Sequence, residues 1–243
     1  KTDFFVYKSV SKGVQEIFIS ATGRPDLPVQ AQAEAHYNKV RDILAQDKAT
    51  IFQERIFGTQ DAVTEAQKAR DQVLAGRVDN VPPSLLVGDK GIKGEYFGIQ
   101  VHLIVSPDRP EVIQSPEGKN VGRLVKTPAC DYLGLSGLTS QTADGAPAQA
   151  RAMFDQANGI LKGYGKDFLS VPRTWLWLKN ILDWYDDLNA VRNAFFTEVG
   201  ILGTTTRHPM PASTGIGLGP AGDRACAMDM TAVLNSDVVI EYH

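Results

Sequence analysis

Two pairs of side chains in this 243-residue chain have a spacing that could bind a small polar molecule. Asn189 and Arg192 lie three residues apart in a helix-like segment, and Gln67 and Arg70 repeat that spacing in the first half. Residues three apart lie on one face of a helix, so each pair presents an amide beside a guanidinium. Such a pair could bind a carboxylate or a hydroxyl group. A solvated helix face is the alternative interpretation.

An acidic side chain near the C-terminus is a candidate for proton transfer. Asp229 stands between Met228 and Met230 in a strand-like segment. Since alternate residues of a strand point to opposite faces, the carboxylate faces away from the two methionines. A carboxylate can accept a proton from water, so Asp229 is a candidate catalytic group. A solvent-facing carboxylate at a strand edge is the alternative.

Further candidate side chains lie in loops of the second half. Arg207 and His208 precede a Pro-Met-Pro sequence, where they could meet an entering ligand. The pKa of a histidine side chain is ordinarily close to neutral, so His208 could serve as a general acid; a surface histidine is the simpler interpretation. Arg224, just before the last predicted strand, is a weaker candidate cation.

The elements that would position these residues occur twice. Residues 31–44 read AQAEAHYNKVRDIL and residues 148–161 read AQARAMFDQANGIL. A repeat distance of about 120 residues is the size of a domain, which predicts two tandem copies of one fold. We expect the domains to span residues 1–110 and 118–243, with a linker in or just after the Pro- and Asp-rich segment 106–116.

Each half alternates short strands with longer helices. Strands are predicted at 4–7, 16–20, 50–58, 96–105, 131–136, 170–178 and 223–234, and helices at 29–46, 62–74, 147–164 and 183–199. The order ββαβαβ predicts an α+β fold in which two helices cover one face of a mixed sheet. The other, apolar sheet face must be covered too, so we expect sheet-to-sheet contact between the copies or between chains.

Composition argues against several classes of function. The formal net charge is −3 and no basic stripe is present, whereas a nucleic-acid surface needs one to neutralise phosphates. Cys130 and Cys226 lack zinc-ligand spacing and are expected to be buried, reduced thiols. No apolar stretch has membrane-spanning length, and no secretory signal pattern is visible. We expect a cytoplasmic protein with no nucleic-acid or membrane partner and no metal or cofactor.

Short motifs of the second half follow one another in a recognisable order. They are Leu135-Ser136-Gly137, Arg173-Thr174-Trp175, Leu188-Asn189-Ala190-Val191, Met210-Pro211-Ala212-Ser213 and Asp229-Met230-Thr231-Ala232-Val233. This order resembles the Rid/YjgF family of enamine and imine deaminases, formerly labelled L-PSP. The first half resembles the family more faintly, over about residues 4–105.

The resemblance implies a trimer-like packing of domains, with clefts between neighbours. In the family an Arg after a Pro-Ala pair holds a substrate carboxylate, and an acid on the last strand positions water. Asp229 matches that acid, whereas Gln100 is its counterpart in the first half. Ser213 and Ser84 stand where the Arg is expected. A serine hydroxyl cannot replace the bidentate guanidinium, so the chain departs from the family pattern.

These observations lead to three hypotheses. The first is a hydrolase of the enamine/imine deaminase type, acting on a small carboxylate-bearing metabolite and working as a homo-oligomer with trimer-like domain packing. Asp229 would then orient water, Ser213 and Thr214 would line the pocket, and Arg192 with Asn189, or alternatively Arg207, would bind the substrate carboxylate. The second is a chorismatase-like hydrolase, since that family also resembles two fused Rid-like domains. The third is a non-catalytic binding or scaffold protein.

Overall fold

The computed structural model describes residues 4–11, 13–90, 94–140, 142–203 and 210–235. Its elements in the first half are β1 (Phe4–Ser11), β2 (Val14–Thr22), α1 (Val29–Asp47), β3 (Ala49–Gly58), α2 (Gln60–Val73), β4 (Ser84–Val87) and β5 (Tyr96–Val105). The second half contains β6 (Glu111–Gln114), β7 (Asn120–Lys126), β8 (Asp131–Leu138), α3 (Ala146–Gly163), a 3-10 turn (Phe168–Ser170), β9 (Arg173–Leu178), α4 (Ile181–Glu198), β10 (Ala212–Ile216), β11 (Gly219–Pro220) and β12 (Cys226–Leu234).

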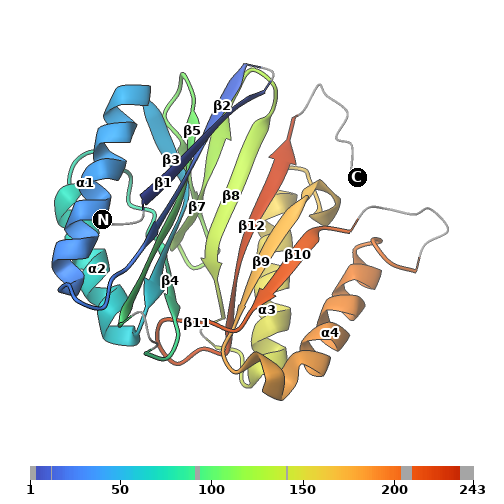
Figure 1. The fold of residues 1–243 in the computed structure, drawn as a ribbon. Helices are drawn as coiled ribbons and strands as arrows, with labels where there is room; N and C mark the ends of the chain where they lie inside the picture. The colour runs from blue at the N-terminus through green and yellow to red at the C-terminus, as the bar shows by residue number, and fades with distance from the viewer. Residues whose placement is uncertain (1–3, 12, 91–93, 141, 204–209, 236–243) are drawn as a thin grey trace.

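The strands form two mixed sheets, which confirms the predicted α+β fold. Their orders are β1-β2-β5-β3-β4-β11 and β10-β9-β12-β8-β7-β6. The pairs β3/β4 and β9/β10 are parallel, and the remaining pairs are antiparallel. Helices α1 and α2 cover the outer face of the first sheet, and α3 and α4 cover that of the second (Figure 1).

Four short strands depart from the sequence expectation. Ser84 and Ser213 were expected in turns, yet Ser84 begins β4 and Ser213 lies in β10. Strands of four or five residues are too short to show a clear alternation of apolar and polar side chains. The two-residue strand β11 comes from the second half and pairs with β4, so the first sheet includes a piece of the second half. Strand β6 begins at Glu111, inside the segment expected as a linker.

The helices form where apolar residues recur at helical spacing. In α1, Ala33, Tyr37 and Val40 are fully buried against the first sheet. The helix ends at Lys48, which takes a left-handed conformation with φ 52° and donates its N–H to the carbonyl of Leu44. The second half builds its larger core in the same way, between α3, α4 and the outer face of its sheet.

The inner faces of the two sheets pack against each other, which confirms the expected sheet-to-sheet contact. Phe52 of β3 meets Tyr132 of β8 with ring centroids 6.1 Å apart, and Phe57 meets Trp177 at 5.8 Å. The backbones approach closely at Gly134, where a Cβ atom would lie 2.8 Å from the Phe52 ring. The contact between halves is therefore close-packed, with no room for an added methyl group at this point.

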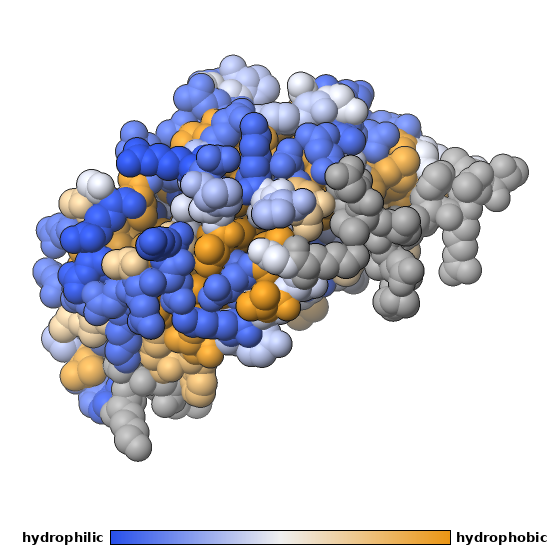
Figure 2. Space-filling view, turned by 90° about the horizontal axis from the view of Figure 1, so that it is seen from above, coloured by the Kyte–Doolittle hydropathy of each residue, from blue (hydrophilic) through white to orange (hydrophobic). Residues whose placement is uncertain are grey.

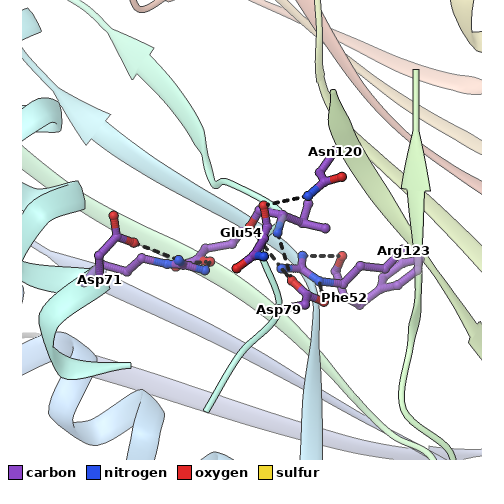
Figure 3. Close-up of polar contacts among 9 residues, drawn as sticks. Phe52, Glu54, Asp71, Asp79, Asn120 and Arg123 are labelled. Atoms are coloured by element: carbon purple, nitrogen blue, oxygen red, sulfur yellow. Dashed lines mark hydrogen bonds and ion pairs between the residues drawn. The ribbon is translucent and has the colours of Figure 1, made fainter. Parts of the chain in front are cut away.

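Buried charged side chains also connect the halves. Arg123 of β7 donates to both carboxylate oxygens of Asp79, at 2.7 and 2.6 Å, and to the carbonyl of Val81 at 3.2 Å (Figure 3). On the outer face of β3, Arg70 of α2 forms an ion pair with Glu54 at 2.7 Å. Since a buried charge is costly unless it is paired, these contacts fix the strands that carry them.

The inner face of the first sheet is only partly covered by the second. Phe5 and Tyr7 of β1 are 65% and 66% exposed, and Phe18 of β2 is 41% exposed. Seen from above, the molecular surface is mostly hydrophilic, with hydrophobic patches exposed between the polar side chains (Figure 2). In the described part of the chain, no helix has the length and apolar character needed to cross a membrane.

Candidate functional site

Asp229 lies between the two sheets and is fully buried. Its Oδ1 accepts hydrogen bonds from the Ser84 hydroxyl and from the Gly137 N–H, both at 2.7 Å. Its Oδ2 accepts from Nε of Arg55 at 2.6 Å. We call these four residues the Asp229 cluster. Its carboxylate and glycine come from the second half, and its guanidinium and hydroxyl come from the first.

Strand register explains why Arg55 and Ser84 reach the same carboxylate. Arg55 of β3 pairs with Ser84 of β4, so both side chains point from the inner face of the first sheet. Asp229 projects from the inner face of the second sheet, because its neighbours Met228 and Met230 belong to the core on the helix side. The sequence prediction that Asp229 faces away from these methionines is confirmed.

A cavity of about 850 Å³ opens beside the Asp229 cluster. Ser84 and Gly137 of the cluster line it, together with Ser136, Thr139, Ser140 and Lys119. We call it the serine cavity. Asp229 itself does not line the cavity; two lining residues connect the cavity to the buried carboxylate, Ser84 through its hydroxyl and Gly137 through its N–H. A hydroxyl in this position can donate to the carboxylate while its lone pairs accept from a water molecule.

The structure places Ser213 and Thr214 on opposite faces of β10. The Ser213 hydroxyl lies 2.7 Å from the Thr174 hydroxyl, and Thr174 pairs with the core residue Met230. Thr214 instead pairs with Trp175, which pairs with Asp229, so Thr214 shares the inner face with Asp229. The strand pairing therefore makes Thr214 the equivalent of Ser84 in the second sheet. The sequence motifs instead align Ser84 with Ser213.

The two amide–guanidinium side-chain pairs predicted on helices lie away from the Asp229 cluster. Asn189 and Arg192 belong to α4, which packs on the helix side of the second sheet, opposite to Asp229. In the first half, Arg70 pairs with the buried Glu54 and with Asp71, so it holds α2 on β3. The structure therefore does not bring the amide–guanidinium pairs together with the predicted acid. Arg207 and His208 lie outside the described residues, and Arg224 is partly buried just before β12.

Sequence reasoning missed Arg55. Its segment TIFQERIFG was recognised as a half-buried strand, and an Arg among apolar strand residues is the signal that could have identified a buried cation. Its partner could not be predicted, because the Arg55–Asp229 contact joins residues 174 positions apart across the two sheets.

No group of three or more His, Cys, Asp or Glu side chains that could hold a metal ion is found among the described residues.

Comparisons with known proteins give matches in structure only. No protein-family profile matches the chain, and no curated protein matches its sequence. YjgF from E. coli is 22% identical over 45% of this chain and 84% of its own, with a TM-score of 0.36. TdcF from E. coli, solved with bound serine, is 17% identical over 46% of this chain and 86% of its own, with a TM-score of 0.36. RidA from an Antarctic Psychrobacter is 17% identical over 52% of this chain and all of its own, with a TM-score of 0.40. Each of these matches covers about half of this chain.

Proposed function

We propose that the protein is a small-molecule hydrolase of the enamine/imine deaminase type and that its reaction takes place in the serine cavity. The observation that carries this proposal is the Asp229 cluster. There, a strand-end glycine and a last-strand acid of one half meet the serine that begins β4 in the other half, within hydrogen-bond distance. This layout agrees with the cleft between neighbouring domains that the sequence resemblance implies.

The chemistry assigned to the cluster is water activation through Ser84. In imine hydrolysis, water adds to the C=N carbon, and the resulting carbinolamine loses ammonia to leave a carbonyl. The Ser84 hydroxyl donates to Asp229, so it can accept a hydrogen bond from water in the cavity and pass a proton to the carboxylate. The ion pair with Arg55 holds the carboxylate in place beside the Ser84 hydroxyl.

The substrate carboxylate requires a cation, and the serine cavity offers one. Lys119 is the cationic side chain among its lining residues, and Glu117 and Asp155 are the acidic ones. We therefore assign carboxylate binding to Lys119 in place of the Arg192 or Arg207 expected from the sequence. A lysine binds a carboxylate as a point charge, without the fixed fork of an arginine, so broad selectivity for small acids follows.

The proposal is tested by incubating the protein with 2-aminoacrylate generated in situ and, separately, with chorismate, the substrate of the chorismatase-like alternative. Asp229→Asn and Ser84→Ala remove the acid and the connecting hydroxyl. Asp187→Asn, an exposed site on α4, is the matched control. We expect faster loss of 2-aminoacrylate with the wild type and the control than with either cluster variant. Equal loss with all four proteins and with buffer would reject the proposal.

The burial of Asp229 favours a second candidate, a non-catalytic binding protein. Its carboxylate is fully buried and accepts three hydrogen bonds, so it is satisfied without substrate. A thermal-shift screen with small carboxylic acids separates the two functions. Stabilisation without turnover of any of these acids or of 2-aminoacrylate would support binding alone.

A further inference from the structure

A second cavity lies on the uncovered part of the inner face of the first sheet. It has a volume of about 550 Å³, within the size range of pockets for drug-sized ligands. We call it the aromatic cavity, because its walls include the rings of Phe5, Tyr7, Phe18, His102 and Trp175. The serine cavity and the aromatic cavity share no lining residue.

Strand register places polar and aromatic side chains in two rows across this cavity. One row runs Phe5, Ser20, Gln100 and Arg55 through β1, β2, β5 and β3. The other runs Tyr7, Phe18, His102 and Gln53 through the same strands. Both rows point from the inner face, so the cavity has an aromatic end on β1 and β2 and a cationic end at Arg55.

The cation at this end is incompletely satisfied. Arg55 is 6% exposed, and its Nε is bonded to Asp229. Its Nη2 is buried without a hydrogen-bond partner in the described part of the chain. An unpaired buried N–H of a charged group is costly, and a ligand oxygen that accepts from it would remove that cost.

The charges around Trp175 also favour an anion. The Cζ of Arg55 lies 4.3 Å from the centre of the Trp175 ring, and the Cζ of Arg173 lies 4.9 Å from it. Arg173 donates to the Thr214 hydroxyl at 2.6 Å, and no ion pair with a carboxylate is found for it among the described residues. Asp229 pairs with the Arg55 guanidinium. Arg173 is therefore the guanidinium beside Trp175 that has no carboxylate partner among the described residues.

From these observations we propose that the aromatic cavity is a binding site for a planar, ring-containing carboxylate. The carboxylate accepts a hydrogen bond from Arg55 and balances the charge of Arg173 beside Trp175. The ring lies among Phe5, Tyr7 and Phe18, where offset or edge-to-face contacts between aromatic rings are favourable. Gln100 and Ser20, both exposed, offer hydrogen bonds to ring substituents.

Benzoate serves as the probe, and calorimetric titration of the full chain measures its binding. Benzamide has the same shape without the charge, and acetate has the charge without the ring. Arg55→Lys keeps a cation beside Asp229 but removes Nη2. Gln100→Glu adds a negative charge at an exposed wall position, and Gln72→Glu makes the same change on the outer helix α2, as a control.

We expect benzoate to bind to the wild type and to Gln72→Glu equally. We expect benzamide and acetate to bind to the wild type about tenfold or more weaker than benzoate does, equivalent to about 1.4 kcal/mol. We expect Arg55→Lys and Gln100→Glu each to weaken benzoate binding by a similar factor. The absence of binding heat with millimolar benzoate, or equal affinities for benzamide and benzoate, would overturn the proposal.

A homo-oligomer could cover the same sheet face. If sedimentation shows a wild-type dimer that Gln100→Glu dissociates, and benzoate does not bind, the occupant is a second copy and the proposal is wrong. Because the assay measures binding heat, its result does not depend on turnover in the serine cavity.

Discussion

Arg55 of the first half and Asp229 of the second form an ion pair 2.6 Å long, with side chains 8% and 0% exposed. The two sequence copies therefore meet through opposite charges at the centre of the sheet-to-sheet contact. The two copies carry different residues at the equivalent position of their sheets. Strand β12 of the second sheet has Asp229 there, and strand β5 of the first sheet has Gln100. Only the second half carries the acid, and only the first half supplies its guanidinium and hydroxyl partners.

Loss of either partner of this ion pair should destabilise the fold strongly. Arg55→Met leaves a buried carboxylate without its counter-ion, and breaking such a pair costs about 3–5 kcal/mol of unfolding free energy. Urea denaturation measures this cost. The matched control is Arg151→Met, which removes the ion pairs that the 37% exposed Arg151 side chain forms with Asp155 and Glu198 and should change stability far less.

The double variant Arg55→Met, Asp229→Leu tests the same pair in another way. It removes both charges together, so no uncompensated buried charge remains. We expect its unfolding free energy to exceed that of Arg55→Met alone. A double variant destabilised by the full sum of the two single changes would contradict a direct interaction.

The close approach of the two sheets predicts that a Gly→Ala substitution has opposite effects on stability at two positions. Gly134→Ala places a Cβ atom 2.8 Å from the Phe52 ring, so the sheets must separate. Overpacking of this kind costs about 1–3 kcal/mol. Gly159→Ala in α3 meets no atom within 4 Å and should stabilise the helix by about 0.5–1 kcal/mol. Equal melting temperatures for the two variants would argue against the observed sheet contact.

Protonation of His36 should reduce stability in mild acid. His36 is fully buried on α1, and burial, with a smaller contribution from Lys39, lowers its pKa from 6.5 to about 4. Because the folded state binds the proton less readily than the unfolded state, the stabilisation is present above pH 6.5 and is lost as pH falls towards 4. The loss amounts to about 3 kcal/mol at most. Urea denaturation at pH 7 and pH 5 should show a smaller difference for His36→Gln than for the wild type. Equal differences would exclude His36 as the source.

Both thiols should be unreactive in the folded protein. Cys130 and Cys226 are buried and free, as expected from the sequence. Burial raises the pKa of Cys226 to about 12 and also raises the pKa of Cys130. Since the thiolate is the reactive form, a chromogenic disulfide reagent should react slowly before unfolding and with two thiols per chain after it. Rapid reaction of one thiol in the native protein would show that its segment opens.

The long elements were predictable because their signals are local. Tyr96–Val105 was predicted with the bounds that the structure shows, and the helix predicted at 29–46 differs from α1 by one residue. Apolar periodicity within ten or more residues suffices for such predictions. The site depends on contacts between the halves, which no local pattern contains. The sequence therefore singled out Asp229 and Ser84 as candidates, but it gave no sign of Arg55, which contacts Asp229 across the two sheets.

The central claim is that Asp229 and Ser84, contributed by different halves, act together on substrate. Its most direct test is kcat/KM for 2-aminoacrylate hydrolysis by the wild type, Ser84→Ala, Asp229→Asn and the double variant. Groups that act as a unit give strongly non-additive losses. We expect each single change to lower kcat/KM by about tenfold or more, equivalent to about 1.4 kcal/mol, and the double variant to be no slower than the slower single variant. Fully multiplicative losses, or a wild-type rate equal to the uncatalysed rate, would contradict it.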